Sequence, residues 1–142
     1  MKVLHVSHGC LPEMSGGVEG YLDAVLAEQR RQDLEVVLLA GSHELRPATV
    51  IETHAAGVHR LHRDDLYFDL WSKSYSPAAE VVIDEFFART RPDVVHVHQW
   101  IRLTSNLVEI AARHGIPAVV TCHDVYTSCP RCFRVRRDDE AC

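Results

Sequence analysis

The feature that most constrains the fold of this chain is the alternation of short apolar runs with amphipathic segments along its whole length. Four runs, at residues 2–7, 35–41, 93–98 and 117–122, have the composition of β-strands. The second run, EVVLLAG, shows no alternation of polar and apolar side chains. That pattern suits a strand covered on both faces, as in parallel sheets. The last run, PAVVTC, is likewise expected to be a buried strand.

Amphipathic segments separate these runs and are predicted to be helices. Residues 17–32 carry apolar side chains at helical spacing and charged side chains on the opposite side. A second helix is expected to begin at Pro77, because proline at the first helical position loses no bonded N–H. Ser76 is its predicted N-cap, and the helix is expected to continue to about Thr90.

Two further segments complete the expected secondary structure. Residues 104–115 are predicted to form a helix with Thr104 as its N-cap and Gly115 at its end. Residues 48–63 alternate weakly and are predicted to hold one or two short strands, with a turn at Gly57. The resulting order is β-α-β-(β)-α-β-α-β.

This order predicts an α/β fold with right-handed crossovers: a mostly parallel, doubly wound sheet between two layers of helices. In such sheets ligands bind at the carboxyl ends of the strands, near the point where the strand order reverses. The candidate site residues are therefore expected directly after Ser7, Gly41, His98 and Cys122.

Composition limits the class of protein. With 142 residues, 46% of them hydrophobic and 25% charged, residues 1–142 are expected to form one globular domain. The net charge of −5 argues against nucleic-acid binding, which needs a concentrated basic face. No apolar run approaches the about 20 residues of a membrane span, and the amino terminus does not resemble a signal peptide. We therefore expect a cytoplasmic protein whose five cysteines are thiols or ligands rather than a disulfide framework.

A glycine pair follows the first predicted strand. Gly16 and Gly17 open the first helix, and backbone N–H groups at a helix amino end favour an anion such as phosphate. The spacing G-G-x-x-G differs from the dinucleotide-binding and phosphate-loop patterns. A simple turn from strand to helix is the alternative interpretation.

Two histidines lie in the run at 93–98, and an aromatic residue follows it. His96 and His98 are two residues apart and share one face of a strand, a spacing that can serve a metal. Since no further ligand lies at a familiar spacing, we expect no metal here. His96 is instead expected to be buried, and His98 and Trp100 are expected to line the edge of a cleft.

His123 and Asp124 follow the last predicted strand. Histidine is the side chain best suited to share a proton near neutral pH, and a nearby carboxylate can fix its tautomer. Neighbours in an extended chain point in opposite directions, so Asp124 need not contact His123. A structural histidine is the alternative, but its place at a strand end favours a site.

Three stretches together resemble a known family. MKVLHVSHGCLPEMSGGVEGYLDAVLAE, RPDVVHVHQW and IPAVVTCHDVYTSCPR are similar, in this order, to the amino-terminal domain of retaining glycosyltransferases of family four, which have the GT-B fold. The resemblance implies a Rossmann-like, acceptor-side domain of a carbohydrate-biosynthesis enzyme. It also implies a nucleotide-sugar donor, a sugar or lipid acceptor, and transfer of a hexosyl group with retention of the anomeric configuration.

The resemblance also implies roles for particular residues. Gly16 and Gly17 would border the donor diphosphate and the acceptor, and His123 would hydrogen-bond the donor sugar near the reacting centre. The departing diphosphate would help to take the acceptor proton, without a required metal or other cofactor. The residues expected to bind donor or acceptor are Gly16, Gly17, His98, Trp100, Asp124 and Arg131.

One part of the family's architecture is not found in this sequence. The second domain of the family supplies most of the nucleotide pocket and the cations that neutralise the diphosphate. It is expected to be absent from residues 1–142, and the first domain is expected to be incomplete at its C-terminus. Departure of a diphosphate needs such electrostatic stabilisation. We therefore expect residues 1–142 alone to be inactive.

The tail carries the remaining candidates. Cys129, Cys132 and Cys142 form a C-x-x-C pair plus a third thiol, one ligand short of a tetrahedral zinc site, so loop thiols are the favoured interpretation. The arginines of the tail, Arg131 among them, can face an anionic acceptor or make peripheral contact with a membrane, but neighbouring acidic residues offset them. The alternative function is a small non-catalytic α/β module with a Cys-rich zinc-binding loop.

Overall fold

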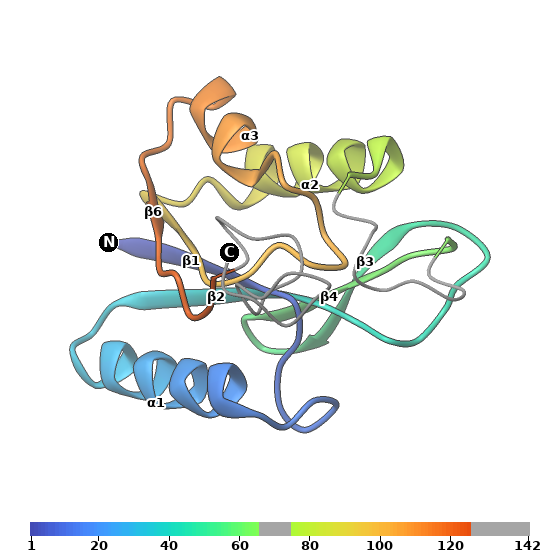
Figure 1. The fold of residues 1–142 in the computed structure, drawn as a ribbon. Helices are drawn as coiled ribbons and strands as arrows, with labels where there is room; N and C mark the ends of the chain where they lie inside the picture. Colours follow the sequence, from blue (N-terminus) through green and yellow to red (C-terminus); the bar gives the residue numbers. More distant parts are fainter. Residues whose placement is uncertain (66–74, 126–142) are drawn as a thin grey trace, which may run out of the picture.

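The structure is a computed structural model that describes residues 1–65 and 75–125. Within these ranges the chain folds into three layers, with a sheet between helix α1 on one side and helices α2 and α3 on the other (Figure 1). The predicted α/β order is confirmed. The elements are β1 (Lys2–Ser7), α1 (Gly17–Arg31), β2 (Glu35–Gly41), β3 (Val50–Ala55), β4 (Val58–His62), α2 (Pro77–Thr90), β5 (Val94–Val97), α3 (Leu107–Arg113) and β6 (Ala118–Val120).

The sheet is mostly parallel, as the sequence predicts. Its strand order is β3-β4-β2-β1-β5-β6, and only β3 runs antiparallel to its neighbour, β4. Strand β1 lies in the middle, with Val3 paired to Val36 of β2 on one side and to Val94 of β5 on the other. The strand order therefore reverses at β1, and the carboxyl ends of β1 and β5 form the switch point where ligands bind in such sheets.

Alternate side chains of the central strands divide between two hydrophobic clusters. On one face Leu4, Val37 and Val95 pack with residues of α2 and α3 in the larger cluster. On the other face Leu22 and Leu26 of α1 pack against apolar side chains of β2 and the loop residue Cys10, in the smaller cluster that consists of Cys10, Leu22, Leu26, Val36, Leu38 and Ala40. Two layers of helices thus bury both faces of β2, as its uniform apolar composition indicates.

Local signals place α2 and the β3–β4 hairpin where the sequence predicts them. The Ser76 hydroxyl oxygen accepts a hydrogen bond from the Ala79 N–H at 3.2 Å, and Pro77 occupies the first helical position. The turn between β3 and β4 contains Gly57, whose φ of +70° is strained for any residue with a side chain. A Cβ atom there would also lie 3.0 Å from the Val36 oxygen.

Two predictions at the carboxyl-terminal part were wrong. Thr104 does not cap α3, which begins at Leu107 with Asn106 as its N-cap. The Thr104 hydroxyl instead donates to Glu80 Oε1 of α2 at 2.8 Å, and its oxygen accepts from the Asn106 N–H at 3.3 Å in the loop before the helix. Strand β6 is not buried: it lies at the edge of the sheet, and Val120 is 42% exposed.

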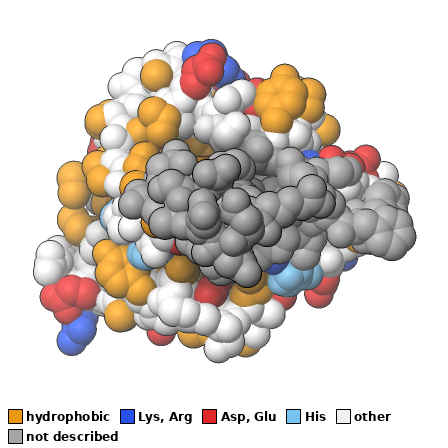
Figure 2. All heavy atoms as spheres, viewed as in Figure 1, with side chains coloured by type: hydrophobic (Ala, Val, Ile, Leu, Met, Phe, Trp, Pro, Cys, Tyr) orange, Lys and Arg blue, Asp and Glu red, His pale blue; other side chains and the backbone are white. Residues whose placement is uncertain are grey.

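The surface agrees with the mixed charge of the sequence. On the face shown in Figure 2, the basic side chains of the described residues lie singly or beside acidic ones, and they do not form one concentrated patch. Among the described helices, none has the length and apolarity needed to cross a membrane.

We predict that Ile83 of α2 is a major contributor to stability. Its side chain is completely buried in the larger cluster, so Ile83→Ala should lower the free energy of unfolding by about 2–5 kcal/mol. The matched control on the same helix is Val81→Ala, because Val81 is 59% exposed and its truncation should change stability by about 0.5 kcal/mol or less. Urea unfolding measures both, and equal effects would contradict this packing.

Candidate functional site

The candidate site lies at the carboxyl edge of the sheet, where the segments after β1, β5 and β6 meet. The hydrogen bond from the His98 N–H to the Val6 oxygen, at 2.8 Å, continues the β1–β5 pairing to the end of β5. In the same way the Thr121 N–H donates to the Val97 oxygen at 2.9 Å. These two bonds place the residue after β5 and the residues after β6 side by side.

Gly16 and Gly17 open α1 as the sequence predicts. Gly16 is the N-cap, Gly17 is the first helical residue, and no side chain of residues 1–65 or 75–125 caps this end of the helix. A Cβ atom at Gly17 would meet no atom within 4 Å, whereas one at Gly16 would lie 2.7 Å from Glu19 Oε2. As far as the described residues go, the space next to Gly17 is therefore open, and N–H groups at a helix amino end are suited to an anion, although the buried Glu19 carboxylate already lies in this first turn.

His123 lies close to the first turns of α1. Its Nε2 is 3.2 Å from Nδ1 of His98, and the two rings stack with their centroids 5.4 Å apart. The ring of Tyr21, one turn after Gly17, meets His123 edge-on at a centroid distance of 5.0 Å and His98 at 5.9 Å. Tyr21 thus connects the helix that begins at the glycine pair with the histidine that follows β6.

The burial of the two histidines around β5 is the reverse of the expected one. His98 is only 2% exposed, because the rings of His5, His96 and Tyr21 surround it. His96 is half-buried, and its Nε2 lies 2.7 Å from the Thr121 hydroxyl oxygen. Burial lowers the pKa of His98 to about 3, so this imidazole is neutral at physiological pH.

Asp124 interacts with the loop after β5. The Gln99 side-chain N–H donates to Asp124 Oδ2 at 2.9 Å, and Gln99 Oε1 accepts from the Trp100 N–H at 2.8 Å. Trp100 itself packs against the larger hydrophobic cluster on the α2–α3 side of the sheet. The structure therefore brings His98, His123 and Asp124 together but places the Trp100 ring against the opposite layer.

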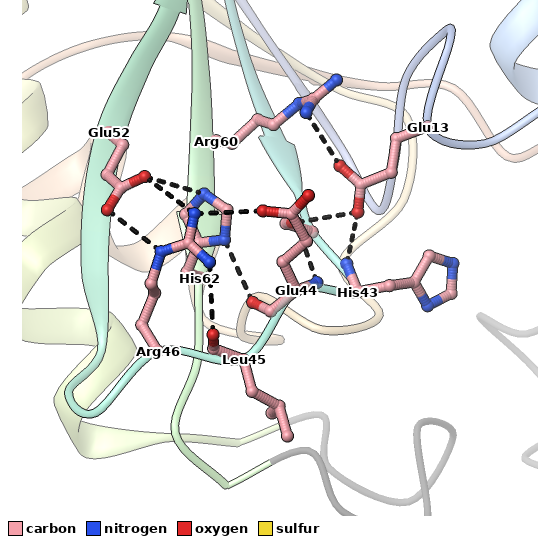
Figure 3. Close-up of polar contacts among 9 residues, drawn as sticks. Glu13, His43, Glu44, Leu45, Arg46, Glu52, Arg60 and His62 are labelled. Atoms are coloured by element: carbon pink, nitrogen blue, oxygen red, sulfur yellow. Dashed lines mark hydrogen bonds and ion pairs between the residues drawn. The ribbon is translucent and has the colours of Figure 1, made fainter.

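A network around Glu13 holds the loops after β1 and β2 together (Figure 3). Glu13 Oε1 accepts hydrogen bonds from the Ser42 hydroxyl and the His43 N–H, and Oε2 lies 3.2 Å from the Arg60 guanidinium. Burial opposes ionisation of Glu13, but these hydrogen bonds and Arg60 lower its pKa overall. A second group beside it joins Arg46 to Glu44 and Glu52. The contact of Glu13 with the buried Arg60 thus helps to fix one side of the candidate site, whereas the carboxylates paired with Arg46 are exposed.

Three functional candidates were missed in the sequence. His5, in the middle of β1, contacts both His98 and Gln29 of α1. Arg102, 5% exposed and with a φ of +65°, donates to the His8 oxygen at 3.1 Å. The only sequence signal for His5 is a histidine inside an otherwise apolar strand, and nothing local marks Gln29 or Arg102.

A metal at this edge would have one set of ligands among the described residues. His5, His96 and His98 each offer a ring nitrogen, and these atoms lie within 4.8 Å of one another. Two of those rings are already joined, since His5 Nδ1 lies 2.9 Å from His98 Nε2. The expectation that no metal is required stays a prediction.

The thiols divide between described and undescribed parts of the chain. Cys10 is a buried free thiol and Cys122 an exposed one. The other candidates of the tail, Arg131 with Cys129, Cys132 and Cys142, lie outside the described residues.

Solved structures share the fold of this chain. A sucrose-phosphate synthase from Thermosynechococcus elongatus matches with a TM-score of 0.55 and 11% identity, over 89% of this chain and 34% of that one. A UDP-GlcNAc 2-epimerase from Neisseria meningitidis, bound to UDP-GlcNAc, matches with a TM-score of 0.50 and 16% identity, over 93% and 36%. A trehalose 6-phosphate synthase from Burkholderia multivorans matches with a TM-score of 0.50 and 15% identity, over 84% and 32%.

These neighbours establish the GT-B-like architecture of the domain but not its chemistry, because identities this low show the fold alone. The chain spans about a third of the length of each. No curated protein sequence matches the chain. The sequence model of a family described as Glycosyltransferase Family 4, however, matches residues 15–139, from the glycine pair to the tail. The match covers most of the sequence, so the chain belongs to Glycosyltransferase Family 4.

Proposed function

We propose that this chain is the acceptor-side, amino-terminal domain of an enzyme that transfers a hexosyl group from a nucleotide-diphosphate sugar to a sugar or lipid acceptor. The family match supports transfer of a sugar. The observation that carries the proposal is the placement of Tyr21, one turn after Gly17, against the rings of His98 and His123. The glycine pair and the histidine thereby share one edge of the sheet, where ligands bind in doubly wound folds.

In this proposal each residue acts from its position in the fold. The open amino end of α1 at Gly17 receives the donor diphosphate, whose negative charge its free N–H groups and helix dipole favour. His123 hydrogen-bonds a hydroxyl of the donor sugar. Asp124, held by Gln99, and the tail residue Arg131 are proposed to contact donor or acceptor.

The proposed chemistry retains the configuration of the anomeric carbon. The bond between that carbon and the diphosphate oxygen breaks, and a bond to the acceptor oxygen forms on the same face of the sugar. The acceptor proton moves to the departing diphosphate. No metal is required, since cationic side chains and helix dipoles can stabilise the developing charge.

A second domain is part of the proposal. The chain spans about a third of its structural neighbours, and the nucleotide pocket and diphosphate-binding cations are proposed to come from a carboxyl-terminal GT-B domain. Residues 1–142 alone are therefore proposed to be inactive, and the complete enzyme to act in the cytoplasm. The family match favours this function over a non-catalytic zinc-binding module.

The direct test uses an enzyme that contains both domains. It is incubated with a panel of UDP-, GDP- and ADP-sugars and candidate acceptors, and release of nucleoside diphosphate identifies the donor. Proton NMR of the product then reads the anomeric configuration. An inverted product would overturn the retaining mechanism, and absence of nucleoside diphosphate release from every donor would overturn sugar transfer.

We predict that Gly17→Ala in that enzyme raises the KM for the nucleotide sugar by about 10–100-fold. The added methyl group enters the open space at the start of α1, where a small displacement of the diphosphate is costly. Gly20→Ala is the matched control, because a methyl group on Gly20 would likewise meet no atom within 4 Å but lies one turn further along the helix. Similar KM values for both variants would contradict the proposal that the diphosphate binds at this position.

We also predict that His123→Ala lowers turnover by about 10²-fold, the scale for loss of a positioned polar group at the reacting centre. The control is His54→Ala, since His54 is an exposed residue of β3 at the far edge of the sheet. Turnover is measured at saturating donor, and circular dichroism checks the fold of both variants. An unchanged rate for His123→Ala would exclude it from the site.

A further inference from the structure

A row of hydrogen bonds leads from α1 through the sheet to His123. Gln29 Oε1 lies 2.7 Å from His5 Nε2, and His5 Nδ1 lies 2.9 Å from His98 Nε2. His98 Nδ1 in turn lies 3.2 Å from His123 Nε2. The four side chains come from α1, β1 and the ends of β5 and β6, so this row exists only in the folded sheet. We call it the histidine row.

The inner rings of the histidine row are neutral. His5 is completely buried and His98 nearly so, and burial lowers the pKa of both. The neighbouring rings of His96 and Tyr21 and the cation of Arg30 add no negative charge that would favour imidazolium. A neutral imidazole has one N–H donor and one acceptor nitrogen.

In a row of neutral rings, every N–H group must donate in the same direction along the row. Each ring that accepts at one nitrogen has to donate from the other, so fixing the first contact fixes every later one. Gln29 presents its carbonyl oxygen, which only accepts, and His5 therefore carries its proton on Nε2. His98 Nε2–H then donates to His5 Nδ1, and His123 Nε2–H donates to His98 Nδ1.

We propose that Gln29 is a positioning residue that sets the tautomer of His123 through His5 and His98. At a pH where His123 is neutral, all three rings are then Nε2–H tautomers, and Nδ1 of His123, which takes no part in the histidine row, carries a lone pair. Such a nitrogen accepts a hydrogen bond from a sugar hydroxyl but cannot donate to an ether or fluorine. This selectivity for a hydroxyl rests on the proposed function, whereas the tautomers themselves do not.

The test reads the tautomers directly, without substrate, in the 15N-labelled chain at pH 8, where histidines of ordinary pKa are neutral. Long-range 1H–15N correlation spectra identify which ring nitrogen carries the proton. We expect Nε2–H for His5, His98 and His123, and an averaged signal for the exposed His54. A proton on Nδ1 of any of the three rings in the unmodified chain would overturn the proposal.

Substitutions of Gln29 test whether it sets the direction. Gln29→Glu keeps an acceptor and should leave all three rings as Nε2–H tautomers, whereas Gln29→Lys supplies only donors and should shift all three to Nδ1–H. Gln32→Leu is the control, because Gln32 is exposed at the end of the same helix and contacts Glu28 instead. An unchanged His123 tautomer in a folded Gln29→Lys variant would overturn the role of Gln29.

Two further measurements separate this proposal from its alternatives. About one equivalent of zinc retained after purification, with joint shifts of His5, His96 and His98 on its removal, would overturn it, because a metal takes the lone pairs that the histidine row uses. If the tautomers are as expected but the two-domain enzyme releases no nucleoside diphosphate, the proposed function fails while the histidine row stands.

Discussion

The pairing of β1 with both β2 and β5 is the constraint on which the rest of the structure depends. It joins the first residues of the chain to residues 35–40 on one side and 94–97 on the other. The same pairing creates the reversal of strand order and places the loops after β1 and β5 next to each other. It also sets His5 in register with His96, so two histidines far apart in sequence share one face of the sheet.

The face of the sheet toward α1 is unusual because it is polar near β1 and β5. Beside β2 this face is apolar and packs on Leu22 and Leu26, but next to it lie His5, His96 and His98. Buried polar groups are costly unless they are hydrogen-bonded, and here the histidines bond one another, Gln29 and Thr121. Such satisfied networks favour one arrangement of side chains, which suits a site that has to hold a ligand in one orientation.

Structural features that neighbouring residues determine were predictable from the sequence, and features that depend on the strand order were not. Ser76 and Pro77 fix the start of α2 by themselves, and Gly57 fixes a turn. The contact between His5 and His98 depends on which strand lies beside β1, which no local pattern states. The capping role expected for Thr104 failed because the helix begins three residues later, at Leu107, and Thr104 instead contacts Glu80 of another helix. The resemblance of three ordered stretches was enough to predict the family, while the roles of the site residues stay proposals.

The central position of β1 also bears on how the chain folds during synthesis. Val3 leaves the ribosome 91 residues before its partner Val94. At about 5–20 residues per second, translation leaves one edge of this apolar strand without its neighbour for about 5–20 s. During that interval the exposed strand edge is a template for other chains, and chaperones that bind nascent polypeptides would be most useful to this protein.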